Sequence, residues 1–148
     1  MVTALKVAEP ADVDLILHLM EEYCAFDHLP FDEQVRRKAI HVFLEAGMLG
    51  KLWLILSEGE TVGYLVLTLG FSFEYGGYDA FVDEVYLRES HRGKGIGKMA
   101  LALAEEACHT LHVQALHLEV ERENANAYAL YRRVGFTEHD RYLMTKIL

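Results

Sequence analysis

A glycine-rich turn constrains the fold of this chain most strongly, because it connects an apolar run to a periodic helix. The turn, Arg92-Gly-Lys-Gly-Ile-Gly97, follows a predicted strand at 80–87 and leads into a predicted helix at 96–109. In a turn with so few side chains, successive backbone N–H groups can point at one anion, and the positive end of the helix dipole adds to the attraction. The turn therefore predicts a binding site for a phosphate group.

The length and composition of the chain indicate a single domain over residues 1–148. A chain of 148 residues buries about two thirds of the surface that its unfolded form exposes. No apolar run reaches the roughly 18 residues that span a bilayer, and no signal-type segment opens the sequence, so we expect a cytoplasmic protein without a membrane partner. Cys24 and Cys108 lie on apolar helical stripes without metal-ligand spacing, which predicts buried, reduced thiols and no metal.

The net charge of −9 is unevenly distributed along the chain. Residues 1–84 carry 15 acids and 5 bases, a balance of −10, whereas residues 85–148 carry 8 acids and 9 bases, a balance of +1. This division suits a protein that holds an anionic cofactor in one half and meets a cationic partner with the other, although an acidic surface that only maintains solubility explains it equally well. The chain has no basic stripe with interleaved aromatic residues, so nucleic acid is not an expected partner.

The predicted elements follow the order β-α-α-β-β-β-α-β-α-β. They are a strand at 3–7, helices at 10–26 and 32–47, a hairpin at 52–56 and 61–69, a strand at 80–87, a helix at 96–109, a strand at 115–120, a helix at 124–134 and a final β-region at 136–148. We expect the segment 70–78 to form a loop. The order predicts a mixed sheet covered by helices.

Three phosphate-binding motifs can be compared at the glycine-rich turn. A Walker loop would need Gly at position 92 and Ser or Thr at position 99, where the chain has Arg92 and Met99. A dinucleotide fingerprint fits Gly95, Gly97 and Ala100, but the preceding strand belongs to an antiparallel meander and barely fifty residues remain for a doubly wound sheet. The pattern Arg-x-x-Gly-x-Gly is the one that fits both the residues and their context.

A second motif lies on the predicted helix at 124–134. Asn124, Ala127 and Tyr131 follow one another at helical spacing, and Gly135-Phe136 ends the helix. Together with the strand and turn before it, this segment resembles the GCN5-related N-acetyltransferase (GNAT) superfamily, specifically from about 80 to 136. The resemblance implies a GNAT-like α/β fold, with a mixed, mostly antiparallel sheet of six to seven strands flanked by four helices.

The resemblance also implies that acetyl-coenzyme A (acetyl-CoA) is the co-substrate. Its pyrophosphate would lie on the N–H groups of the turn, and its pantetheine arm would pair with the backbone of Val85 and Leu87, where this strand separates from the strand that carries Leu118. Asn124 would hydrogen-bond the pantetheine or adjacent atoms of the cofactor. The implied cofactor-binding residues are Val85, Tyr86, Leu87, Arg92, Gly93, Lys94, Gly95, Ile96, Gly97, Lys98, Asn124 and Ala127.

Acetyl transfer to an amine requires a proton acceptor and a proton donor. An alkylammonium group has a pKa of about 10 and must lose a proton before it attacks a thioester, so Asp83 and Glu84 are candidate bases. Strand alternation sends their side chains to opposite faces, and the sequence does not choose between them. The resemblance assigns the oxyanion donor to the backbone near Val85 and the protonation of the leaving thiolate to Tyr131. Surface or salt-bridging roles for the two carboxylates, and packing for the tyrosine, are the alternatives.

Two segments are candidates for binding the acceptor. One connects the first two helices, and the other lies in the expected loop, where aromatic rings and a carboxylate could attract an ammonium group. Their residues are Asp27, His28 and Phe31 in the first, and Phe73, Glu74 and Tyr75 in the second. A plain interhelical turn is the alternative for the first, and a hairpin connection or dimer contact for the second.

These inferences predict a metal-independent N-acetyltransferase that moves an acetyl group from acetyl-CoA directly to a primary amine of a small, cationic acceptor. A non-catalytic acyl-CoA sensor, a protein N-terminal or lysine acetyltransferase, and a nicotinamide-binding protein are the alternatives. The sequence is also compatible with a homodimer.

Overall fold

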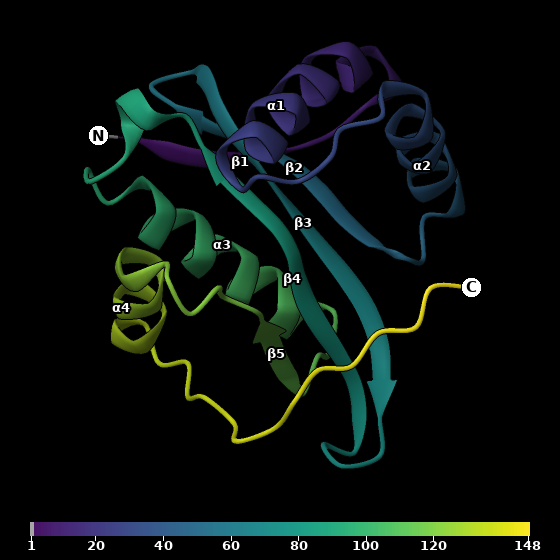
Figure 1. Cartoon of the computed structure of the whole chain (residues 1–148), viewed down its shortest axis with the longest axis vertical. Helices are drawn as coiled ribbons and strands as arrows, with labels where there is room; N and C mark the ends of the chain where they lie inside the picture. Colours follow the sequence, from purple (N-terminus) through teal and green to yellow (C-terminus); the bar gives the residue numbers. More distant parts are fainter. Residues whose placement is uncertain (1) are drawn as a thin grey trace.

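The computed structural model describes residues 2–148 and contains a five-stranded sheet in the order β1-β2-β3-β4-β5 (Figure 1). Neighbouring strands are antiparallel except for β4 and β5, which run parallel. The strands are β1 (Thr3–Val7), β2 (Gly50–Ser57), β3 (Glu60–Ser72), β4 (Gly77–Leu87) and β5 (Ala115–Leu118), and the α-helices are α1 (Val13–Phe26), α2 (Glu33–Ala46), α3 (Ile96–Thr110) and α4 (Ala125–Arg133). Within residues 2–148, no helix combines the length and the apolar character that a membrane crossing requires.

Local sequence signals explain where the helices begin and end. The Asp32 carboxylate accepts a hydrogen bond from the Val35 N–H at 3.1 Å and caps α2, which ends at Gly47 in the left-handed conformation. The Asn124 side chain caps α4 in the same manner, by accepting from the Ala127 N–H. Each boundary of the helices predicted from the sequence lies within three residues of the observed boundary.

The sheet separates two hydrophobic cores, with α1 and α2 on one face and α3 and α4 on the other (Figure 1). Ile16, Leu19 and Tyr64 are fully buried on the first face. Leu65, Leu67 and Ile96 are fully buried on the second face. Adjacent residues of β3 thus contribute to opposite cores, so both faces of this strand are covered.

Two predictions about β-structure were wrong. The sheet has five strands rather than six to seven, because the expected β-region at 136–148 lies outside the sheet and forms no strand. The segment 70–78, expected to be a loop, instead extends β3 to Ser72 and begins β4 at Gly77, which leaves only a short turn at 73–76. A hairpin satisfies the backbone hydrogen bonds of this segment, which a nine-residue loop would leave to water.

A β-bulge in β4 changes which face its side chains occupy. Val66 of β3 pairs with Glu84, but the next residue, Leu67, pairs with Val82, so Asp83 is an extra residue. Before the bulge, Val82 packs in the core beneath α3, and after it Tyr86 packs in the core beneath α1. The bulge therefore inverts the alternation of β4 at the residues that the sequence proposes as bases.

Candidate active site

β4 and β5 separate at the point where the GNAT resemblance requires a slot. Their parallel pairing ends at Val82 and Leu118, and β4 then continues to Leu87 without a neighbour on that side. The Arg88 N–H donates to the Val62 carbonyl of β3 at 2.9 Å. Because backbone groups alternate in direction along a strand, the polar groups of Val85 and Leu87 point away from β3, toward this open edge. The edge can therefore pair with an extended ligand.

The glycine-rich turn follows this edge directly and presents the first N–H groups of α3. Gly93 and Gly95 have φ values of +73° and +82°, a conformation that side-chain-bearing residues rarely adopt. The Met99 N–H donates to the Gly95 carbonyl, so the N–H groups at 96–98 precede the hydrogen-bonded turns of the helix. Free N–H groups at a helix start favour an anion, which is the kind of ligand that the sequence predicts for this turn.

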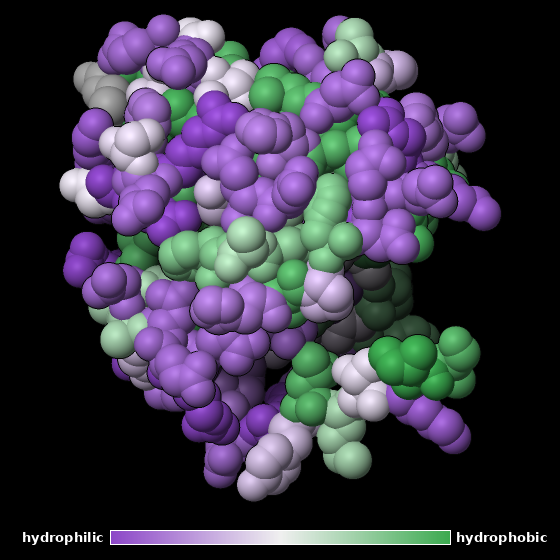
Figure 2. Space-filling view, turned by 45° about the horizontal axis from the view of Figure 1, so that its top comes forward, coloured by the Kyte–Doolittle hydropathy of each residue, from purple (hydrophilic) through white to green (hydrophobic). Residues whose placement is uncertain are grey.

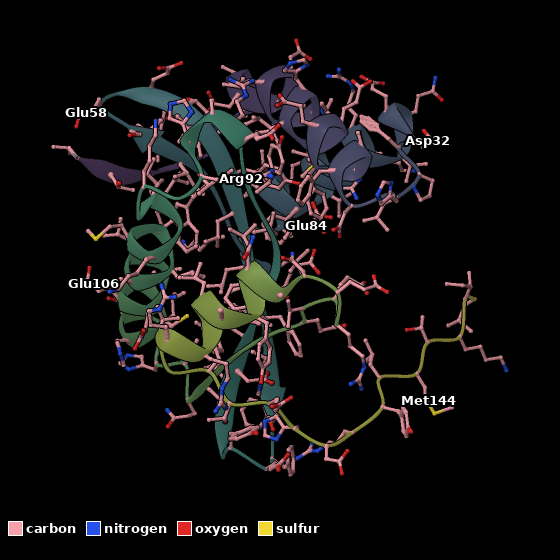
Figure 3. The ribbon with its side chains drawn as sticks, turned by 60° about the vertical axis from the view of Figure 1, so that its left-hand side comes forward. Asp32, Glu58, Glu84, Arg92, Glu106 and Met144 are labelled. Carbon is pink, nitrogen blue, oxygen red and sulfur yellow. The ribbon has the colours of Figure 1, made fainter. Side chains whose placement is uncertain are left out.

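The Arg92 side chain is partly buried and packs against the ends of α1 and β4. Its Nε donates to the Leu87 carbonyl at 2.8 Å, and its guanidinium lies 4.1 Å from the centre of the Phe26 ring. Figure 3 shows Arg92 between the strands and the start of α3. Arg92 therefore ties the end of α1 to the end of β4, while Lys94 and Lys98 are exposed beside the turn.

Asp83 and Glu84 occupy different environments on the α2 side of the sheet. Glu84 Oε1 accepts hydrogen bonds from Arg36 Nη1 and from the Tyr64 hydroxyl, each at 2.8 Å. Desolvation raises the pKa of Asp83, and the Glu84 charge raises it further, whereas the Arg36 charge lowers it. The bulge interrupts the strand alternation on which the prediction of opposite faces depends. Hydrogen bonds to Arg36 and Tyr64 occupy the Glu84 carboxylate, whereas Asp83 is exposed where β4 and β5 separate.

Three tyrosine rings pack against one another beside Glu84. The centres of Tyr23, Tyr64 and Tyr86 lie 6.2 to 6.3 Å apart. The Tyr86 hydroxyl donates to Glu22 at 3.2 Å, and Arg88 pairs with the same carboxylate at 3.1 Å. Burial raises the pKa values of all three phenols, which keeps them neutral. The cluster fixes α1 against β3 and β4 beneath the site.

Tyr131 lies on α4, partly buried against the core beneath α3. Its ring makes an edge contact with Phe136 at a centre distance of 6.1 Å. Burial raises the pKa of the Tyr131 phenol, and the charge of Asp27 at the end of α1 raises it further. The structure thus brings Asp27 within electrostatic range of Tyr131, and the phenol keeps its proton at neutral pH.

Asn124 has a structural role beside its expected role toward the pantetheine. Its Oδ1 accepts from the Ala127 N–H at 3.2 Å, which caps α4. The Asn124 amide nitrogen is then the part of the side chain that can donate to a ligand. Both residues are partly buried at the start of α4.

The six predicted acceptor-binding residues do not form one cluster. Asp27 and the exposed His28 lie at the end of α1, whereas Phe31 packs against the core between α1 and α2. The other three lie at the β3–β4 turn, about 20 Å along β4 from Asp83 at 3.3 Å per residue. There Phe73 is 93% exposed and contacts Phe71, Glu74 pairs with Arg141 at 3.3 Å, and Tyr75 contacts His117.

Sequence reasoning missed the residues that connect the elements of the site. Arg36, Tyr64 and Phe26 are far from the motifs in the sequence, and each acts through a contact that only the tertiary fold creates. The position of Arg36 could have been noticed in the sequence, because Arg36 lies one turn before Ile40, an apolar residue that is buried on α2. An arginine there has its guanidinium close to the core and needs a buried acid.

Comparison with known proteins agrees with this geometry. The model of the acetyltransferase (GNAT) family matches residues 14–136. This chain belongs to the GNAT family. YycN of Bacillus subtilis, an uncharacterized N-acetyltransferase, is 35% identical over 97 residues, which cover 65% of this chain and 61% of the length of YycN.

Solved structures show the same GNAT fold. The integron cassette protein HFX_CASS3, from the mobile metagenome of Cole Harbour Salt Marsh, superposes with a TM-score of 0.86 at 37% identity and covers 97% of this chain and 90% of its own. A predicted acetyltransferase from Clostridium acetobutylicum, solved with acetyl-CoA, has a TM-score of 0.81 at 13% identity and covers 98% and 96% of the two chains. GNAT proteins use acetyl-CoA.

Proposed function

We propose that this GNAT protein transfers the acetyl group of acetyl-CoA directly to a primary amine. The observation that carries the proposal is the separation of β4 from β5 after Val82, directly before the glycine-rich turn. An extended pantetheine arm can pair with the backbone of Val85 and Leu87 while the pyrophosphate meets the N–H groups at 96–98. The Leu87 carbonyl already accepts a hydrogen bond from the Arg92 side chain. The Leu87 N–H is therefore the backbone group of this residue that is left to bind the ligand.

We infer that Asp83 takes the proton from the attacking amine, directly or through one water molecule. It lies where the two strands separate, and its raised pKa makes it a better base than an ordinary surface aspartate. Arg36 and Tyr64 already donate hydrogen bonds to the Glu84 carboxylate, so Glu84 contributes its negative charge to the site rather than accepting the proton. The amine nitrogen bonds to the thioester carbon and the carbon–sulfur bond breaks, which leaves a thiolate.

Tyr131 is the group that protonates this thiolate. Its neutral phenol is a proton donor on α4, the helix that also carries Asn124 at its start. After the transfer, the phenolate recovers a proton from solvent. No step in this scheme requires a covalent enzyme intermediate.

The charge around the site favours a small acceptor that carries a positive charge. Asp27, Asp83 and Glu84 supply three carboxylates, and Arg36 offsets one of them. Carboxylates concentrate a cation locally, and salt screens their effect because the Debye length falls severalfold between roughly 0.02 M and 0.5 M. The kcat/KM for diamines should therefore fall as salt rises, while that for neutral amino sugars should change little. Acidic amino acids as the best acceptors would contradict this assignment.

A screen of primary amines that follows CoA release tests the proposed activity. We expect release that depends on the amine and yields one acetylated product per CoA. Tight binding of acetyl-CoA without release for any small amine, peptide N-terminus or lysine peptide would instead support a non-catalytic acyl-CoA sensor.

A further inference from the structure

A histidine on β5 is enclosed by two aromatic rings and a carboxylate. His117 Nε2 lies 3.2 Å from Oδ2 of Asp79 on β4, and the two side chains are 20% and 16% exposed. The centre of the His117 ring lies 4.9 Å from that of Phe81 and 5.2 Å from that of Tyr75. We call these four residues the His117 cluster, since each of the other three contacts the imidazole.

The His117 cluster lies on the face of the sheet opposite α3. Asp79 and Phe81 are two residues apart on β4 and therefore share a face. Ala80 and Val82 alternate with them and pack in the core beneath α3. His117 is the parallel partner of Phe81, so it lies on the same face as Phe81. None of the four cluster residues belongs to the core beneath α1 and α2, and Phe81 is 40% exposed, so the cluster is open to a ligand.

An open groove connects the cluster with the proposed proton donor. The groove has a volume of about 990 Å³ and is lined by all four residues of the His117 cluster and by Tyr131 of α4. Figure 2 shows the molecule hollowed beside the C-terminal segment, whose residues 142 and 143 line this groove. Five acidic side chains and two arginines line the groove, and one of these arginines, Arg141, is paired with Glu74. The surplus of carboxylates favours a cation.

The chemistry of the cluster suits an ammonium group. An imidazole that donates from Nε2 to Asp79 has an acceptor lone pair on Nδ1. The other carboxylate oxygen of Asp79 lies over Gly70, where a Cβ atom would approach it to 2.8 Å, so the lack of a side chain at position 70 makes room for the carboxylate. Carboxylates and aromatic faces both attract ammonium groups. Asp79 would instead repel a carboxylate or phosphate of a ligand.

The cluster lies at a defined distance from Asp83, the proposed proton acceptor. Asp79 precedes Asp83 by four residues on β4, or about 13 Å at 3.3 Å per residue, and Phe81 lies between them. An extended chain advances about 3.6 Å for every three bonds, so the nitrogens of an eight-carbon diamine are about 11 Å apart. With a hydrogen bond at each end, such a molecule reaches from one carboxylate to the other.

We propose that the His117 cluster binds the second ammonium group of an extended aliphatic diamine or polyamine whose reacting amine lies at Asp83. The Asp79 carboxylate pairs with this ammonium group, and Nδ1 of His117 accepts a hydrogen bond from it. The Phe81 ring lies against the methylene chain between the two nitrogens. The inference rests on the proposed acetyl transfer and extends it, because it specifies an acceptor with two amino groups about 11 Å apart.

Acetylation of matched amines tests this preference. Diamines with four, six, eight and ten carbons are compared with octylamine and with 8-aminooctanoic acid, which carries a carboxylate at its far end. The kcat/KM for 1,8-diaminooctane should exceed those for octylamine and for the four-carbon diamine by about tenfold, and the amino acid should be the poorest acceptor. Equal values for octylamine and 1,8-diaminooctane, or a preference for the shortest diamine, would overturn the inference and leave the acetyl transfer standing.

Substitutions in the cluster show whether it carries the preference. Asp79→Asn retains the size of the side chain and removes its charge, and Phe81→Leu removes a ring that is 40% exposed. Each should lower the ratio of kcat/KM for 1,8-diaminooctane to that for octylamine by about threefold or more, and a loss of folded protein alone would not change this ratio. Glu60→Gln alters an exposed carboxylate at the start of β3 and should keep the ratio. An unchanged ratio in both cluster variants would contradict the inference.

Binding without turnover separates the inference from the proposed activity. In nuclear magnetic resonance spectra of the ¹⁵N-labelled chain, 1,8-diaminooctane should shift the backbone amides of Asp79, Phe81 and His117, and octylamine should shift them less. If no amine is acetylated but these shifts occur, the proposed acetyl transfer fails and the diamine site stands. If 1,8-diaminooctane shifts none of these amides, the inference fails, whichever amines are acetylated.

Discussion

Arg36 on α2 donates from Nη1 to Oε1 of Glu84 on β4 at 2.8 Å, where the two side chains are 23% and 15% exposed. Removing the guanidinium leaves a largely enclosed carboxylate with only its tyrosine partner. We therefore expect Arg36→Ala to lower the free energy of unfolding by about 1–3 kcal/mol. Denaturant titration measures this loss.

The neighbouring Arg37 is a matched control, since it pairs with Glu33 and Asp14 at the surface. Arg37→Ala should cost less than about 1 kcal/mol, as exposed ion pairs generally do. Equal losses in the two variants would show that the Glu84 contact adds no more than a surface pair.

Asp83 should make the protein less stable at neutral pH than an uncharged residue would. The pKa of Asp83 is raised on folding, so the folded state binds its proton more tightly than the unfolded state does. This contribution favours folding below the unfolded pKa of about 3.9 and is lost as the pH rises through the folded pKa. Asp83→Asn should therefore have a higher Tm than the wild type at pH about 7, and the difference should shrink toward pH about 3.

The same variant should be a slow enzyme. If Asp83 accepts the proton of the amine, Asp83→Asn should lower kcat/KM by about 100-fold. Greater stability with lower activity is the pattern expected of a functional residue. A variant that is both stabilised and fully active would show that Asp83 is a surface residue without a role in catalysis, which is the alternative that the sequence also allows.

Tyr131→Phe should lower kcat by about 100-fold with little change in acetyl-CoA affinity, because the ring remains and only the proton donor is removed. Tyr128→Phe is the control: this tyrosine lies one turn earlier on α4, and its hydroxyl bonds to Glu138. Steady-state kinetics with the best acceptor distinguishes the two. If Tyr131→Phe keeps its turnover, the phenol serves only to pack against Phe136.

Local signals in the sequence predicted the elements that depend on neighbouring residues. The helix predicted at 32–47 appears in the structure with Asp32 as its cap and Gly47 at its end, and both boundaries reflect short-range preferences. The bulge at Asp83 could not be predicted, because it depends on how β3 and β4 align over many residues.

The end of the chain shows the limit of pattern reasoning most clearly. The segment at 136–148 has the composition of a strand, but a strand requires a partner edge, and in this chain the segment does not reach β5. The Arg36–Glu84 and Arg92–Phe26 contacts were missed for a related reason, since residues 48 and 66 positions apart leave no mark on either local segment. The composition shows that residues 1–84 are acidic. Only the tertiary contacts show which of these carboxylates pair with a cation, as Glu84 does with Arg36.

The most direct test of this account is a nuclear magnetic resonance titration of the ¹⁵N-labelled chain with acetyl-CoA. The largest shifts should occur at the backbone amides of Val85 and Leu87 on the open edge of β4 and at the amides of residues 93–98 in the turn. Saturating shifts confined to these two segments and the start of α4 would support the account. Acetyl-CoA that binds without moving the amides of β4 and the turn, or that moves no amide, would contradict it.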